Sequence, residues 1–162
     1  MARRVFFSFH YDVDNWRAAK VRNMGVVEKD RAVTDNAWET VRKGDDAAIK
    51  RWIDGQIQGK SCTIVLIGAG TAGRKWINYE IEKSWNEGKG LIGIHIHKLT
   101  DANNRTSIKG ASPFSGFTLS DGKALQTYAP TFDPPGRDSA EVYASISANL
   151  EALVDQGISL RS

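Results

Sequence analysis

Residues 61–88 read SCTIVLIGAGTAGRKWINYEIEKSWNEG, and this stretch decides the fold. An apolar run of strand length at residues 62–67 is followed by a glycine-rich turn and then at once by a helical pattern. The residues that have the spacing of a buried face on this predicted helix are Ile77, Ile81, Ser84 and Trp85. A buried strand, a glycine turn and an amphipathic helix in this order are typical of an α/β protein.

The rest of the chain alternates in the same way between apolar strand patterns and helical patterns. Strands are predicted at residues 4–10, 25–27, 62–67 and 91–97, and helices at 15–24, 45–59, 74–87 and 138–156. Asp14 and Asp45 are the predicted N-caps of the first two helices. Residues 98–137 are predicted to be an irregular, insertion-like segment with a hairpin turn at 120–123. We therefore predict one α/β domain over residues 1–162, with a mostly parallel central sheet flanked by helices.

Composition and charge argue against several classes of function. The chain has 162 residues, of which 41% are hydrophobic and 25% charged, as in a soluble globular domain. No segment has the length of a membrane-spanning helix, and the first apolar run is too short for a signal peptide. The net charge of +3 is mild and its basic residues are scattered, which does not indicate a nucleic-acid interface. With Cys62 as its single cysteine, we expect a cytoplasmic protein without nucleic-acid or membrane partners.

Residues 68–73, GAGTAG, match the dinucleotide-binding pattern G-x-G-x-x-G. Such a site also needs an acidic residue at the end of the following strand, where this chain has His95, His97 and Lys98. The pattern is better explained by a tight turn and a close approach of the backbone, with room for a phosphate at the helix start. We expect no bound cofactor.

His95 and His97 alternate on one predicted strand, so both side chains face the same way. Two histidines are too few for a zinc site, which needs three or four ligands, and we predict no metal. A serine-hydrolase triad is equally unsupported, because the chain has no Gly-x-Ser-x-Gly elbow.

Two segments are predicted to converge if the first strand and the strand at 62–67 are neighbours, because parallel strands end at the same crevice. On the helix that follows, Trp76 and Glu80 are one turn apart on a stripe predicted beside the buried face. A lone carboxylate next to an aromatic ring suits chemistry on a nucleotide sugar, so we predict that Glu80 is catalytic. The residues predicted to bind the substrate are Ser8, Phe9, His10, Tyr11, Asp46 and Trp76.

Three motifs of the chain resemble TIR-like domains, and most closely the subfamily typified by the TIR protein of the bacterial Thoeris anti-phage defence system. They are VFFSFHYD at residues 5–12, CTIVLIG with WINYEIEKS at 62–84, and LIGIHIH at 91–97. The Trp-x-x-x-Glu element matters most, since in active TIR domains this Glu is catalytic, and it corresponds to Glu80. The resemblance covers residues 3–97 and is poor after about residue 99.

The resemblance implies a flavodoxin-like fold and cleavage of NAD⁺, as substrate rather than cofactor, at the nicotinamide ribose. It also implies a cyclic ADP-ribose isomer as product, a downstream effector that this diffusible product activates, and self-association into homo-oligomers. Nicotinamide leaves as a neutral molecule, so one carboxylate suffices where ordinary glycosides need two. Arg17 or Lys50 is expected to offset the charge of the pyrophosphate.

The chain departs from the TIR pattern at Gly73, where many active members have a serine; we expect its ligand contact to be either lost or supplied by Thr71. A non-catalytic TIR-like interaction module is therefore the alternative to an enzyme. A receiver-like or flavin-binding regulator is a further alternative, but the strand that should end in a phospho-accepting Asp ends in Gly68.

Overall fold

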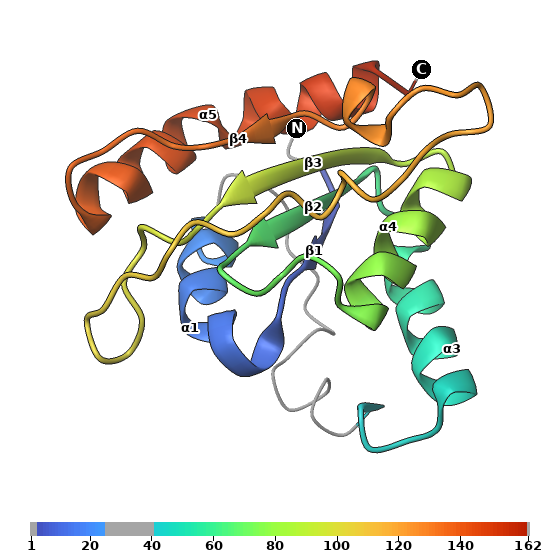
Figure 1. Cartoon of the computed structure of the whole chain (residues 1–162), viewed down its shortest axis with the longest axis horizontal. Coiled ribbons are helices and arrows are strands. Elements are labelled where there is room, and N and C mark those ends of the chain that lie inside the picture. The colour runs from blue at the N-terminus through green and yellow to red at the C-terminus, as the bar shows by residue number, and fades with distance from the viewer. Residues whose placement is uncertain (1–2, 25–40, 162) are drawn as a thin grey trace.

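The computed structural model describes residues 3–24 and 41–161, so the strand predicted at 25–27 lies outside the described residues. One parallel sheet has the order β1-β2-β3-β4 (Figure 1). Its strands are β1 Val5–Ser8, β2 Cys62–Ile67, β3 Gly90–His95 and β4 Thr131–Phe132. The register pairs Ser8 with Val65 and Ile67 with His95, so β1 ends before β2 and β3 do. This α/β arrangement with a parallel sheet confirms the predicted fold class.

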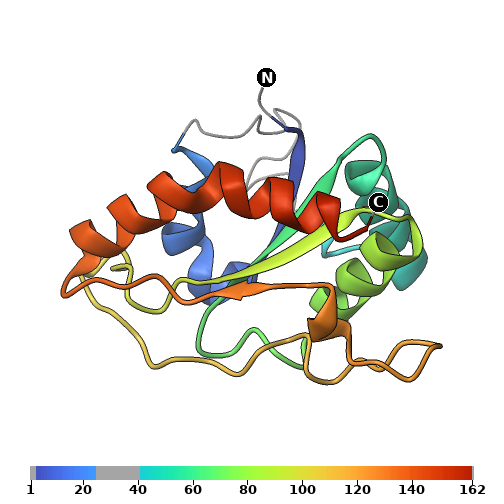
Figure 2. The same cartoon turned by 90° about the horizontal axis from the view of Figure 1, so that it is seen from above.

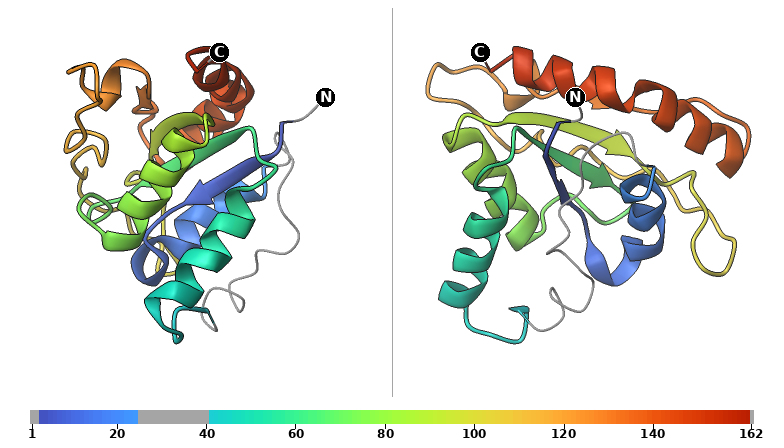
Figure 3. Two further views of the ribbon diagram at one scale, coloured as in Figure 1. Left: turned by 90° about the vertical axis from the view of Figure 1, so that its right-hand side faces the viewer. Right: turned by 180° about the vertical axis from the view of Figure 1, so that it is seen from behind.

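Helices cover both faces of the sheet. They are α1 Tyr11–Arg22, α3 Asp46–Ile57, α4 Lys75–Asn86 and α5 Ser139–Ser159. On one face, α1 and α5 pack against a core that contains Ile64 and Ile94. On the other face, α4 packs on Val65 and Ile67, and α3 lies beside α4 (Figure 3). Among the described residues, no helix is both long and apolar enough to cross a membrane.

The caps of α3 agree with the sequence prediction. The Asp45 carboxylate accepts a hydrogen bond of 2.8 Å from the backbone N–H of Ala48, which satisfies one of the free N–H groups of the first turn. Gly59, just after the helix, has a φ of +80°, a conformation that costs glycine little. These local signals set where α3 begins and ends.

The start of α1 was predicted wrongly. The helix begins at Tyr11 rather than at residue 15, and β1 ends at Ser8 rather than at residue 10. Asp14 is therefore not a cap but a fully buried residue of the first turns, where it forms an ion pair of 3.2 Å with Arg17. An ion pair between residues three apart in α1, rather than capping, explains why an acid occupies this position.

The segment 98–137 leaves the sheet after β3, runs to a hairpin at the far end of the molecule and returns as β4 beside β3 (Figure 2). The predicted turn is present: the N–H of Gly122 donates to the Leu119 carbonyl, and Thr118 pairs with Ala124. The short strand β4 and the 3₁₀ helix Leu125–Thr127 were not predicted. The segment also completes the core, because Phe114 is fully buried.

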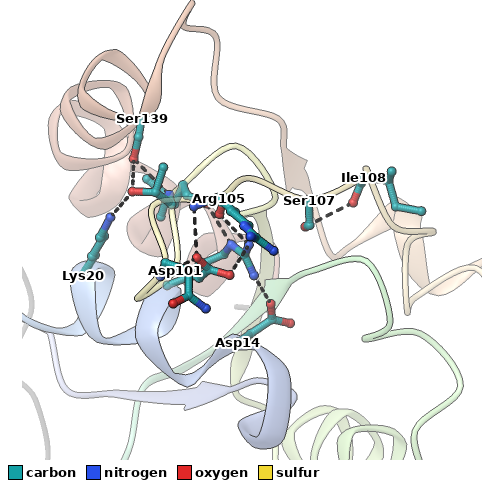
Figure 4. Close-up of polar contacts among 11 residues, drawn as sticks. Asp14, Lys20, Asp101, Arg105, Ser107, Ile108 and Ser139 are labelled. Carbon is teal, nitrogen blue, oxygen red and sulfur yellow. Dashed lines mark hydrogen bonds and ion pairs between the residues drawn. The ribbon is translucent and has the colours of Figure 1, made fainter.

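Hydrogen bonds from Arg17 of α1 hold the start of the segment 98–137 against this helix. The Arg17 guanidinium donates to the carbonyl oxygens of Leu99 at 2.8 Å and Arg105 at 2.9 Å, in addition to the ion pair with Asp14. Figure 4 shows this group, with Asp101 next to Arg105. Arg17 is 3% exposed, and a second carboxylate, that of Asp101, lies 3.7 Å from its guanidinium.

The glycine-rich turn after β2 requires close backbone packing, as predicted. A Cβ at Gly68 would lie 2.1 Å from an Asp14 carboxylate oxygen, and one at Gly110 would lie 2.0 Å from the Gly68 carbonyl oxygen. Within the turn, the Thr71 hydroxyl accepts a hydrogen bond of 2.8 Å from the N–H of Gly68. α1, the turn and the segment 98–137 therefore meet at Gly68.

We expect Gly68→Ala to lower the free energy of unfolding by about 1–3 kcal/mol, because the new methyl group overlaps Asp14. Gly55→Ala is the control: Gly55 lies within α3 and has no atom near its missing Cβ, so alanine should stabilise by about 0.5–1 kcal/mol. Urea denaturation of both variants measures the two effects. Equal stability of the two variants would contradict this packing.

Candidate active site

A cavity of about 300 Å³ opens at the carboxyl end of β1, beside the first turns of α4. Three segments supply its lining: the end of β1 with the start of α1, one residue before α3, and the start of α4. The lining residues are Phe9, His10, Tyr11, Asp12, Arg42, Arg74, Lys75, Trp76, Ile77 and Glu80. The two segments that were predicted to converge do meet here.

Glu80 is the buried acid of this cavity. It is 7% exposed and lies on the sheet side of α4 between Ile77 and Ile81, so its predicted place on a stripe beside the buried face was wrong. The helical spacing explains the correction, because Glu80 follows Ile77 by three residues and precedes Ser84 by four. Room for a carboxyl group exists there because β1 ends early, at the small residue Ser8.

Burial raises the pKa of Glu80 from 4.5 to about 8, because the ionised carboxylate loses its hydration. Hydrogen bonding from Ser8 acts in the opposite direction and lowers the pKa. The Ser8 hydroxyl is itself fully buried and has no hydrogen-bond partner of normal geometry among the described residues. Ser8, predicted to bind the substrate, is not among the residues that line the cavity; its effect is on the pKa of Glu80.

Aromatic rings form much of the cavity wall. The centroids of Phe9 and Tyr11 are 6.4 Å apart, and Trp76 makes an edge-to-face contact of 5.9 Å with Tyr79. The Lys75 ammonium group makes a cation–π contact with the Trp76 ring, 4.9 Å from the ring centroid. These contacts hold the rings of the wall in defined orientations.

His10 directly precedes α1 and lies near both acidic and basic side chains. Burial lowers its pKa, Arg74 lowers it further, and Asp14 and Asp12 act in the opposite direction. The imidazole is therefore neutral near pH 7, with one nitrogen able to donate and the other able to accept. Its buried Nδ1 has no hydrogen-bond partner among the described residues.

Asp46, predicted as a substrate contact, does not line the cavity. It is the first residue of α3, and its exposed carboxylate forms an ion pair with Lys75, which does line the cavity. Asp46 therefore lies outside the cavity lining and contacts it only through the ion pair with Lys75.

Three cations were missed as lining residues: Arg42, Arg74 and Lys75. Arg74 and Lys75 directly precede Trp76, and this position at a helix start was the signal that could have found them. Arg42 precedes α3 without any local pattern.

Arg17 and Lys50, which were expected to offset the pyrophosphate charge, do not line the cavity, and neither does Thr71. Arg17 is held in its buried network, and the Lys50 ammonium group lies 5.6 Å from the centroid of the Tyr79 ring, outside the lining. Thr71 is fully buried and its hydroxyl bonds to the glycine turn, so it does not replace the missing serine contact.

His95 and His97 form a separate buried pair at the end of β3. Their rings are 5.8 Å apart and nearly perpendicular, and burial lowers the pKa of both. The nearby ion pair of Lys109 with Asp133 has a distance of 2.9 Å. Within residues 3–24 and 41–161, no three His, Cys, Asp or Glu side chains are grouped as metal ligands.

Comparison with known proteins identifies the family. The sequence profile of the family described as "Thoeris protein ThsB, TIR-like domain" matches residues 6–101, more than half of the chain. The chain belongs to this ThsB family. This finding confirms the resemblance, and the matched region includes all three segments that line the cavity.

A relative of known sequence supports the assignment to the ThsB family. The chain is 43% identical over 136 residues to a Bacillus cereus protein named "Putative cyclic ADP-D-ribose synthase ThsB1". The alignment covers 79% of this chain and 71% of the relative. It therefore extends well beyond the Trp-x-x-x-Glu element.

The raised pKa of Glu80 predicts that stability falls as the pH rises. An unfolded glutamate loses its proton near pH 4.5, whereas folded Glu80 keeps it to about pH 8. Between these values the unfolded state binds fewer protons, so the unfolding free energy decreases with pH and levels off above about 8. Glu80→Gln should remove this decrease and be more stable than the unaltered chain at alkaline pH.

Urea denaturation across this pH range measures the effect, with Glu82→Gln on the exposed side of α4 as the control. The control should retain the pH dependence of the unaltered chain. Parallel stability curves for Glu80→Gln and the unaltered chain would show that Glu80 ionises normally.

Proposed function

We propose that this chain is a TIR-domain enzyme that cleaves the bond between nicotinamide and ribose in NAD⁺ and produces a cyclic ADP-ribose isomer. The observation that carries the proposal is the buried carboxyl group of Glu80 in an aromatic-lined cavity at the carboxyl edge of a parallel sheet. The printed name of the ThsB1 relative supports the same product. A purely structural glutamate would more commonly be found exposed.

The chemistry requires one carboxylate. When the C1′–N bond breaks, its electron pair goes to the nicotinamide nitrogen, and this neutralises the positive charge of the ring. The leaving group therefore needs no proton, unlike that of an ordinary glycoside. The ribosyl centre gains positive charge in the transition state, and a nearby Glu80 carboxylate stabilises it electrostatically.

The second half of the reaction closes the ring. A nucleophile on the adenosine side, for example a hydroxyl group, bonds to C1′ and gives up its proton. Ionised Glu80 accepts this proton, which balances the reaction and returns the residue to the protonated form favoured by its pKa of about 8. If water attacked instead, the product would be linear ADP-ribose, so cyclisation requires a site that excludes water.

Substrate binding prepares Glu80 for this role. The free site keeps the proton on Glu80 at neutral pH, because burial disfavours the charge. The nicotinamide ring of NAD⁺ is a cation, and a cation next to a carboxyl group lowers its pKa. Bound NAD⁺ therefore promotes the ionisation that its own cleavage needs.

The surrounding residues orient the substrate in this proposal. Phe9, Tyr11 and Trp76 offer aromatic surfaces to the nicotinamide or adenine ring. Neutral His10 provides a hydrogen bond to ribose or phosphate, and Ser8 favours the ionised form of Glu80 by lowering its pKa. No cofactor takes part in the reaction.

The cellular setting of the proposal follows from the family. We propose that the cyclic product diffuses to a downstream effector in bacterial anti-phage defence and that the chain self-associates when it is active. A reducing cytoplasm that contains NAD⁺ is the expected location, which suits the free thiol of Cys62.

We expect Glu80→Gln to lower nicotinamide release from NAD⁺ by at least about a hundredfold, because the neutral amide cannot stabilise the ribosyl cation. Glu82→Gln, two residues along the same helix, should retain full activity. Nicotinamide is measured by chromatography after incubation with each protein, and circular dichroism checks the fold. Undiminished release by Glu80→Gln would overturn the catalytic assignment.

The pH profile provides an independent prediction. Since the carboxylate is the active form, kcat/KM should rise by up to about tenfold per pH unit and level off above about pH 8, the pKa of free Glu80. The profile of kcat should level off at a lower pH, because bound NAD⁺ favours the carboxylate. A kcat/KM that falls through this range would mean that the protonated acid is the active form.

A further inference from the structure

The charges around the cavity are unevenly distributed. Arg42, Arg74 and Lys75 line it, together with the acids Asp12 and Glu80. Because Glu80 is protonated near pH 7, its side chain contributes little negative charge to the free site. The lining therefore has a cationic side, and two of its cations are consecutive residues at the start of α4, where the helix dipole also favours an anion.

Each of these cations has a partner at the rim. Lys75 forms an ion pair with Asp46, and Arg42 forms one with Asp12. The Arg74 guanidinium donates through Nε to the Gly70 carbonyl at 3.0 Å. This bond uses Nε and ties Arg74, a lining residue of the cavity, to the glycine-rich turn.

The rim ion pairs are weak enough to be exchanged. The side chains of Lys75 and Asp46 are each 64% exposed, and those of Arg42 and Asp12 are 37% and 62% exposed. Exposed pairs of this kind contribute about 0–1 kcal/mol. A phosphate group offers more acceptor oxygens and more charge than one carboxylate, and arginine binds it through two NH groups.

We propose that Arg74 and Lys75, assisted by Arg42, form a subsite for the pyrophosphate of the substrate. In the free protein, Asp46 forms the ion pair with Lys75 and Asp12 the one with Arg42, and the pyrophosphate replaces both carboxylates when it binds. This inference rests on the proposed function and specifies its substrate class: a dinucleotide or nucleoside diphosphate sugar, not a simple riboside. The two halves of the dinucleotide then lie on opposite sides of the cations, with the ribose of the scissile bond toward Glu80. Asp46 acts as a competitor of the substrate rather than as its ligand.

Binding of ADP-ribose tests the subsite without any turnover. Isothermal titration calorimetry at low salt is carried out on the unaltered chain, Arg74→Gln, Lys75→Gln and the control Arg51→Gln, which removes an exposed charge of α3 outside the cavity. We expect the Kd to rise about five- to tenfold in the two cavity variants and to stay unchanged in the control. Lys75→Arg should retain the affinity.

Two results would overturn the subsite. One is equal affinity in the cavity variants and the control; the other is no binding of ADP-ribose by the unaltered chain at millimolar concentration. Asp46→Asn tests the competing acid: affinity should increase by up to about fivefold, whereas a substrate ligand at this position would lose affinity on the same change.

Turnover separates this inference from the proposed function. Nicotinamide riboside has the scissile bond but no phosphate, so Arg74→Gln should lower kcat/KM for NAD⁺ and leave that for the riboside unchanged. An equal loss for both substrates would contradict the subsite. Failure of the unaltered chain to cleave NAD⁺ would overturn the proposed function, while the calorimetry would still decide on the subsite.

Discussion

The burial of one carboxyl group against the end of a short strand is the constraint on which the site depends. β1 stops at Ser8 while β2 continues to Ile67, and the step between them accommodates Glu80 from α4. Loss of hydration there raises the pKa to about 8, close to the pH at which a cell works. In the proposed reaction, the same burial that destabilises the folded protein at alkaline pH makes the carboxylate effective when a cation is bound beside it.

The scaffold around this step is rigid because several elements depend on one turn. Gly68 contacts Asp14 of α1 and Gly110 of the segment 98–137, so the turn cannot move without both. Arg17 adds buried hydrogen bonds from α1 to the same segment. α4 starts directly after this turn, and its first residues carry the cations and the aromatic ring of the cavity. Long-range packing at the turn thus positions the chemistry.

Patterns that are local in sequence were predicted well. Alternation of apolar strands and helices identified the parallel α/β sheet. Trp76 and Glu80 do line one cavity, although Glu80 is buried rather than on a stripe beside the buried face. The parts that were missed depend on tertiary contacts that a sequence pattern does not encode. Asp14 was taken for a cap because the start of α1 at Tyr11 and the packing of Gly68 on Asp14 are known only from the fold. Likewise, β4 has two residues and gains its strand geometry from β3 alone.

The central claim is that Glu80 closes a ring on a nucleotide, and the nucleotide itself is the most direct test. Mass spectrometry of extracts from phage-infected bacteria that express this chain would identify the product. The account predicts that NAD⁺ falls while a species with the mass of ADP-ribose less one water accumulates, and that neither change occurs with Glu80→Gln. Unchanged NAD⁺ without this species, or linear ADP-ribose alone, would contradict the account.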